Sequence, residues 1–551
     1  MNSVWLLLIS VSFYILAYRF YCRLLASKFG EDPNRKTPAE THFDGVDYVP
    51  AKNTLVLFGH HFSSICGAGP IVGPALACAY WGWGPSFFWV LAGSIFLGAV
   101  SDYASLFVSI RSDGKTIAEI ARTEISPKAR VLLSLFIWIS IVLVIAVFSI
   151  FAAKTFIAEP DAVVPSLGLI PLALWTGWFL YGRLMSSAKV TLLSLSVLVL
   201  LLAAGVKFPI LLQPIGGLSP LTLWILLLLA YCFAASVAPV HILLQPRDYL
   251  ASFILFAAIG VGVVGVFVTH PPMQGEMYHG FSSLDWPEAG MLWPMLFVTV
   301  ACGAISGFHS LVSSGTTSKQ IANETQARCV GYGGMLTEGL VGILVVICVA
   351  AGLSKLQLSQ DLRAGGPIEA FAHGYGILSA PLLGSYGTSF AVLALNAFIL
   401  TTLDTATRIA RYLTTELFGI KNKYLATLVV VLAGGSLALT GQWAHLWPTF
   451  GASNQLIAGL ALLVASCWML HRGRAVWYTL IPSVVMLITT IGAFAFQFFS
   501  ALNRTIDGYR SPDFLIAGIS LALIAISVVI ILESLHAVRT RLFLESGSER
   551  V

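Results

Sequence analysis

An apolar segment from Leu55 to about Trp83 contains glycine and proline in a pattern that a continuous helix does not tolerate. Its centre reads Phe58-Gly-His-His-Phe-Ser-Ser-Ile-Cys-Gly-Ala-Gly-Pro-Ile-Val-Gly-Pro74. Backbone that opens at membrane depth has N–H and C=O groups that lipid cannot bind, so it persists only inside a protein or beside a wet cavity. The segment therefore predicts a helix that breaks near Gly67 and Gly69 for a functional reason.

A second segment, from Leu296 to Gln320, repeats this pattern as Cys302-Gly-Ala-Ile-Ser-Gly-Phe-His-Ser310. Each predicted break has histidine beside it, His60 and His61 at the first and His309 at the second. Secondary transporters build substrate and ion sites near the bilayer midplane from discontinuous helices. The two segments together predict a transport site between two broken helices.

Composition places the chain in the membrane, because 57% of its 551 residues are hydrophobic and only 10% are charged. About fifteen stretches of roughly 20 apolar residues predict an all-α polytopic protein. No polar stretch is long enough for a separate soluble domain, so we expect a single membrane unit in contact with lipid. The net charge of +5 is too small to indicate nucleic acid as a partner.

The distribution of lysine and arginine predicts the orientation. Alternate loops are rich in cations, with Lys28, Lys115, Lys128, Lys319, Lys421, Lys423, Arg472 and Arg539 on one side. The opposite loops carry acids such as Glu276 and Glu288. The positive-inside rule then places the N-terminus outside and the C-terminus in the cytoplasm, which requires an odd number of spans.

In that orientation the two broken helices run in opposite directions. Five spans from 54 to 206 and five from 292 to 470 would form a LeuT-like 5+5 inverted repeat. Residues 1–53 would add an N-terminal span and a cytoplasmic loop, 207–291 two additional spans, and 471–551 two C-terminal spans and a short tail. The alternative is a chance occurrence of glycine, which is common in membrane helices.

The chain resembles the carbon starvation protein A (CstA) family over most of its length. Besides the two broken segments, the matching stretches are Gln245-Pro-Arg-Asp-Tyr249, Leu400-Thr-Thr-Leu-Asp-Thr-Ala-Thr-Arg408 and Phe450-Gly-Ala-Ser-Asn-Gln455. The resemblance implies an importer of peptides or pyruvate in the bacterial inner membrane, used when nutrients run short. It also implies a fold of the amino acid, polyamine and organocation (APC) superfamily.

Hydroxyl groups at Thr401 and Thr402, followed by Asp404, predict a coupling-ion site. Small hard cations prefer oxygen ligands, and transporters combine helix hydroxyls with carbonyls that a broken helix frees. Alternatively, the hydroxyls bond to carbonyls of their own helix and Asp404 pairs with Arg408, four residues on. Sodium and protons both remain possible as the coupling ion.

Ionisable residues inside a membrane span are functional candidates, since hydrocarbon penalises charge. His60, His61 and His309 suit a proton relay because imidazole titrates near neutral pH. They could instead hold a metal ion, or remain neutral and bond to helix carbonyls. Asp102 is expected to pair with Arg111 or another loop cation.

A substrate carboxylate requires donors, which the N-termini of broken helices supply. The predicted substrate-binding residues are Ser63, Ser64, Gly67, Ala68, Gly69, Ser306, Gly307 and Ser310. The sequence lacks the P-loop, HExxH and GxSxG motifs, so we expect no enzyme and no cofactor other than H⁺ or Na⁺ as coupling ion. A channel and a metal-dependent membrane enzyme are the alternatives, and the oligomeric state stays open.

Overall fold

The computed structural model describes residues 2–45, 48–181, 186–238, 243–283, 285–441, 443–506 and 509–548. In these ranges the regular secondary structure is helical apart from isolated β-bridges and one hairpin of β1 (Thr505–Ile506) and β2 (Tyr509–Arg510). Among the described residues, twelve helices are long and apolar enough to cross a membrane, or up to 13 when one bent pair counts as a span. The other two of the fifteen predicted spans are helices too short for that count. Two predicted spans end at residues 182 and 240, which lie outside the described residues.

The helices of the first half are α1 (Ser3–Leu16), α2 (Cys22–Phe29), α3 (Pro38–Thr41), α4 (Thr54–Ile65), α5 (Gly69–Trp81), α6 (Trp83–Gly93), α7 (Ala99–Ile110), α8 (Ile117–Glu124), α9 (Pro127–Ala158), α10 (Val163–Tyr181), α11 (Ser187–Lys207), α12 (Pro220–Val237) and α13 (Leu244–Thr269). Those of the second half are α14 (Leu292–Thr299), α15 (Gly307–Gly315), α16 (Gly334–Ala351), α17 (Lys355–Ala364), α18 (Pro367–Leu383), α19 (Gly387–Phe418), α20 (Lys423–Ala438), α21 (Trp443–Leu470), α22 (Trp477–Leu502) and α23 (Phe514–Ser548).

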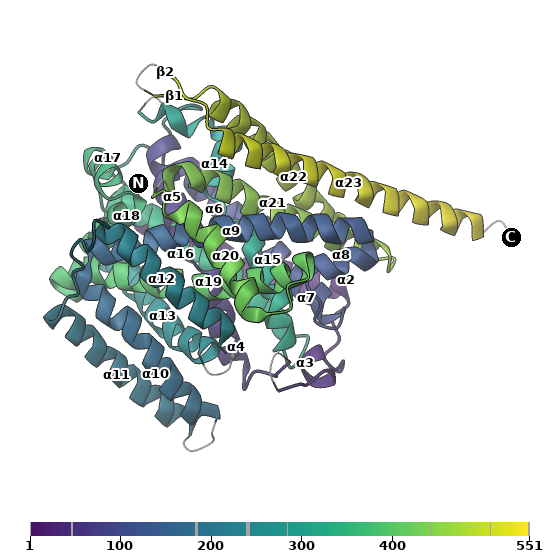
Figure 1. Cartoon of the computed structure of the whole chain (residues 1–551), viewed down its shortest axis with the longest axis horizontal. Helices are drawn as coiled ribbons and strands as arrows, with labels where there is room; N and C mark the ends of the chain where they lie inside the picture. Colours follow the sequence, from purple (N-terminus) through teal and green to yellow (C-terminus); the bar gives the residue numbers. More distant parts are fainter. Residues whose placement is uncertain are drawn as a thin grey trace.

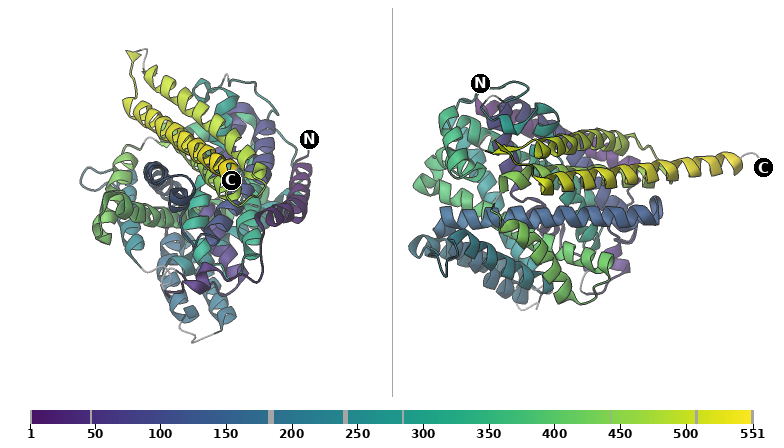
Figure 2. Two further views of the ribbon diagram at one scale, coloured as in Figure 1. Left: turned by 90° about the vertical axis from the view of Figure 1, so that its right-hand side faces the viewer. Right: turned by 45° about the horizontal axis from the view of Figure 1, so that its top comes forward.

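The long helices run between two ends of the molecule (Figures 1 and 2). The N-terminus lies at the end that carries α17, where the backbone N–H of Ser3 donates to the carbonyl of Pro271 at 3.1 Å. The C-terminal helix α23 extends beyond the opposite end, which carries α3 and α8. We call these the α17 end and the α8 end.

Both predicted helix breaks are present. The first separates α4 from α5, which are bent by 47°, and the second separates α14 from α15 across residues 300–306. Gly303 has φ +88, a left-handed conformation that favours glycine. The two breaks lie against each other, because a Cβ on Gly69 would fall 2.2 Å from the Cβ of Cys302. The local chemistry of glycine and proline therefore brings two distant segments into one crossing.

Four helices pack around α9 and α19 in two similar pairs, and one helix of each pair also contacts a broken helix. The helix α13 packs against α4 and α19, while α21 packs against α15 and α9. The helix α12 packs against α9 and α19, and α20 packs against the same two helices. In contrast, α10 and α11 pair with each other on the outside of α13 and expose Trp178, Leu192 and Leu200. Of the five spans predicted to form the first repeat, α10 and α11 therefore lie outside α13.

Candidate functional site

His309, in the first turn of α15, lies between two carboxylates from other helices. Its Nδ1 is 2.9 Å from Oδ2 of Asp102 in α7, and its Nε2 is 2.8 Å from Oε2 of Glu338 in α16. All three side chains are 0% exposed. Two carboxylates and an imidazole in contact titrate as one coupled group. The number of protons that the three side chains hold together sets the charge of the group. We call these three residues the buried triad.

His60 connects α4 to α13. Its Nδ1 is 3.0 Å from Oδ2 of Asp248, to which the hydroxyl of Ser64 also donates at 3.1 Å. The hydroxyl of Ser63 donates to the backbone carbonyl of Asp248 at 3.0 Å. The Nε2 of His60 lies 3.2 Å from Nε2 of Gln320. These contacts hold the first half of the broken helix against α13.

His61 points elsewhere, as expected for adjacent residues on a helix. Its Nδ1 lies 2.8 Å from the hydroxyl of Thr317, and its Nε2 is buried without a hydrogen bond. Within the described residues, one group of three side chains has metal-ligand spacing, and it consists of Asp361, Glu369 and His373 on α17 and α18. None of the three predicted histidines belongs to it.

The predicted ion site brings the expected elements together. The hydroxyl of Thr401 lies 3.0 Å from the carbonyl of Ser63, across the gap between α19 and α4, and 2.9 Å from the carbonyl of Phe398 in its own helix. The hydroxyl of Thr402 is buried without a hydrogen bond, and a Cβ on Gly67 would lie 3.0 Å from it. A helix hydroxyl pair therefore faces the backbone of the first break.

Asp404 is neutralised by a residue on another helix. Arg247 of α13 donates to its carboxylate, and the hydroxyl of Tyr231 in α12 donates to it at 2.6 Å. Arg247 is 0% exposed and also lies 3.4 Å from the carbonyl of Leu400. Arg408, the partner in the alternative interpretation, instead donates to the carbonyls of Ala235 and Ala238. The motif Gln245-Pro-Arg-Asp-Tyr249 contains Arg247, but the sequence spacing does not reveal that Asp404 is its partner.

The predicted substrate residues are buried and contact protein groups. Asn454 accepts a hydrogen bond from the backbone N–H of Phe308 at 2.8 Å and donates to Ser306 at 3.0 Å, so it caps the N-terminus of α15. Ser310 lies 3.1 Å from Ser101. The remaining predicted positions, Ser63, Ser64, Gly67, Ala68, Gly69 and Gly307, are likewise buried. The structure is therefore closed around this part of the predicted site.

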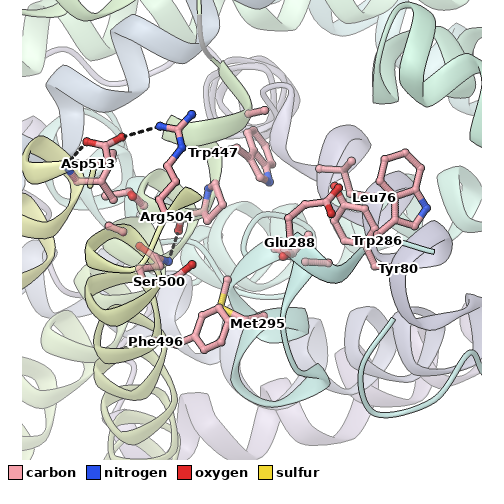
Figure 3. Close-up of a pocket in the computed structure, with 18 of the residues that line it drawn as sticks. Leu76, Tyr80, Trp286, Glu288, Met295, Trp447, Phe496, Ser500, Arg504 and Asp513 are labelled. Carbon is pink, nitrogen blue, oxygen red and sulfur yellow. Dashed lines mark hydrogen bonds and ion pairs between the residues drawn. The ribbon is translucent and has the colours of Figure 1, made fainter. Parts of the chain in front are cut away.

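A cavity of ≈ 590 Å³ opens at the α17 end, between α5, α14, α21 and α22 (Figure 3). Leu76 and Thr299 line it on the two broken helices, and a Cβ on Gly73 would lie 2.5 Å from the carbonyl of Thr299. None of the predicted substrate residues lines this cavity. Sequence reasoning missed it because its walls come from five distant segments.

Buried ion pairs and hydroxyl groups at the crossing of two broken helices, beneath a cavity at one end, define a multi-pass membrane transporter. The model of the family described as "Carbon starvation protein CstA" matches residues 2–360 and 354–493. The chain belongs to this family, as its sequence motifs predicted.

Curated relatives agree with this membership. The peptide transporter CstA of Escherichia coli is 34% identical over 568 residues, covering 89% of this chain and 80% of the relative. The peptide transporter CstA of Bacillus subtilis is 33% identical, covering 89% of each chain. The pyruvate/proton symporter BtsT of Escherichia coli is 32% identical, covering 92% of this chain and 83% of the relative. These relatives are transporters, and this chain is a transporter rather than an enzyme.

Among solved structures, a manganese transporter of Eremococcus coleocola in complex with an aromatic bis-isothiourea substituted compound has a similar fold. The TM-score is 0.52 at 13% identity, covering 90% of this chain and 99% of that one. Its E129A mutant gives a TM-score of 0.50 at 14% identity. At this level of identity the likeness concerns the fold alone.

Proposed function

We propose that this chain is a proton-coupled importer of a short peptide or pyruvate in the bacterial inner membrane, used when carbon is scarce. The names of its relatives support both substrates, and one of them is a proton symporter. The observation that carries proton coupling is the buried triad, in which His309 contacts Asp102 and Glu338 beside the second break. A titratable group at this place can bind a proton from one side and release it to the other.

The proposed fold is the 5+5 inverted repeat, with a revised membership. We assign α12 and α13, in place of α10 and α11, as the last two helices of the first repeat. The matched packing supports this, since α12 and α13 pack on α19 as α20 and α21 pack on α9. The short helix α8 before α9 then corresponds to α17 and α18 before α19. The N-terminus and the α17 end would face outward, and the α8 end the cytoplasm.

Arg247 favours protons over sodium as the coupling ion. Its guanidinium contacts Asp404 and the carbonyl that precedes Thr401, so a fixed positive charge already lies beside the predicted sodium ligands. The carboxylate of Asp404, the third predicted ligand, is thereby paired with Arg247 and is not free to bind a sodium ion at Thr401 and Thr402.

Uptake into proteoliposomes tests the proposal. An inside-alkaline proton gradient should drive saturable accumulation of a labelled dipeptide or of pyruvate, and a sodium gradient of equal size should not.

His309→Gln should reduce proton-driven uptake at least about tenfold, because the amide keeps a polar side chain but does not titrate. His373→Gln is the matched control, since that imidazole is 40% exposed on α18. Sodium-driven uptake, or unchanged proton-driven uptake in His309→Gln, would contradict proton coupling by the triad. Uptake without saturation would indicate a channel.

A further inference from the structure

The cavity at the α17 end has the size and the walls of a binding site for an organic solute. Its ≈ 590 Å³ lies within the roughly 300–1,000 Å³ that is typical of small-molecule sites. Among the described residues, five aromatic side chains line it, namely Tyr80, Trp286, Trp443, Trp447 and Phe496. The rings of Tyr80 and Trp286 are 5.6 Å apart. An apolar body and a cationic group are both favoured beside such rings.

The described charged residues that line the cavity carry a net charge of one negative unit. Of the described residues that line it, Glu288, Arg504 and Asp513 carry charge. Arg504 pairs with Asp513 at 3.4 Å, so these two largely cancel. Glu288 lies apart from them, on the side of Tyr80 and Trp286 (Figure 3). Arg363 stacks on Trp286 at 5.3 Å but lines the neighbouring cavity, not this one.

We propose that this cavity is an outer binding site for solutes that carry a primary ammonium group on an apolar body, with Glu288 as the partner of the ammonium. The N-terminus of a short peptide meets this description. A carboxylate without an amine, such as pyruvate, has no cation for Glu288 and meets a net negative wall. A cleft lined by one sign of charge concentrates solutes of the opposite sign.

The position of the cavity connects this site to transport. Leu76 and Thr299, at its inner boundary, belong to the two broken helices, directly above their crossing. A solute bound in the cavity therefore lies next to the two broken helices, on the side of the α17 end. The inference that it is a transported substrate rests on the proposed function, whereas the ammonium preference rests on the cavity alone.

Calorimetric titration of the purified full-length protein in detergent tests the preference. Alanyl-alanine should bind at least about tenfold more tightly than N-acetyl-alanyl-alanine, which keeps the carboxylate and the apolar body but has no ammonium. Glu288→Gln should reduce this difference to less than about twofold. Glu276→Gln is the matched control, because Glu276 belongs to the same external segment but pairs with Lys355 at 3.3 Å outside the cavity. Equal binding of both ligands by the unaltered protein, or a preserved preference in Glu288→Gln, would overturn the proposal.

The uptake assay separates this inference from the proposed function. If proton-driven uptake occurs without preference for the free amine, the outer site is refuted and the transporter stands. If the binding preference is present and depends on Glu288 but no gradient drives uptake, the site stands and the proposed coupling fails. A protein that does not bind the dipeptide and accumulates neither the dipeptide nor pyruvate refutes both.

Discussion

The buried ionisable side chains around the two breaks have their partners on other helices. His309 contacts Asp102 and Glu338, His60 contacts Asp248, and Arg247 contacts Asp404. An isolated charge at the centre of a membrane helix costs about 2.5–3.5 kcal/mol even on the mildest scale. Pairing across helices offsets this cost and makes each charge sensitive to any movement of its partner helix. Such groups therefore suit a protein that couples ion movement to rearrangement of its helices.

Asp404→Asn should destabilise the protein by about 3–5 kcal/mol, because it leaves the guanidinium of Arg247 buried without a counter-charge. The double variant Arg247→Met with Asp404→Asn should regain part of this loss, since both charges are then absent. Thermal unfolding of the purified variants in detergent measures both effects. Glu533→Gln is the control, because Glu533 pairs with the exposed Lys128, and a much smaller shift is expected. If the loss in the double variant equals the sum of the losses in Arg247→Met alone and Asp404→Asn alone, the pair is not coupled.

Residue types were more predictable from sequence than residue partners. The histidines and the Thr401–Thr402 pair were recognisable because polar groups are rare in apolar spans. Asp102 was expected to pair with Arg111 or another loop cation, but Arg111 contacts Glu324 at 2.6 Å and Asp102 contacts His309 of α15. Glu338 was missed, although an acid inside an apolar span is a functional candidate by the same rule that selected the histidines. Partners separated by about 200 residues are set by helix packing, which a single sequence does not reveal.

Helix breaks, in contrast, follow from local chemistry and were predictable. Gly67, Gly69 and Pro70 interrupt the first helix wherever it lies in the fold. The membership of the repeats does not follow from local chemistry and stays a prediction, because α10 to α13 are all apolar and of similar length. Their packing differs, since α12 and α13 pack against α19 while α10 and α11 pack mainly against each other. The short helix α18 was not expected either, since it carries Glu369, His373 and several glycines.

Gly69→Ala should lower stability by about 1–3 kcal/mol and reduce uptake, because its Cβ would lie 2.2 Å from the Cβ of Cys302 and force the two breaks apart. Cys302→Gly in the same protein should restore part of the loss by removing the atoms in the way. Gly260→Ala in α13 is the matched control, since nothing lies within 4 Å of its added Cβ. Melting temperature and dipeptide uptake measure the effects. A Gly69→Ala protein that matches Gly260→Ala in both would show that the breaks do not pack as described.

Across the whole molecule, contacts at both ends show that α9 and α19 are antiparallel. The hydroxyl of Ser389, near the start of α19, donates to Glu159 after the end of α9 at 3.0 Å. Trp138, in the first half of α9, donates to Thr414 near the end of α19 at 2.8 Å. These two long helices therefore fix the distance between the α17 end and the α8 end, and the broken helices lie beside them.

Cysteine labelling should place Glu276 and Lys421 on opposite sides of the membrane. Between them the chain passes through α14 with α15, α16 and α19, which are three crossings, while α17 and α18 stay at one end. With its 17 residues, α18 is about 25 Å long and shorter than the roughly 30 Å hydrocarbon core. Glu276→Cys should react with an impermeant maleimide in intact cells, and Lys421→Cys only after permeabilisation. Cys329→Ser provides the background, because the seven other cysteines are buried. Labelling of both positions from one side would mean that α18 crosses the membrane, and the inverted repeat would then be refuted.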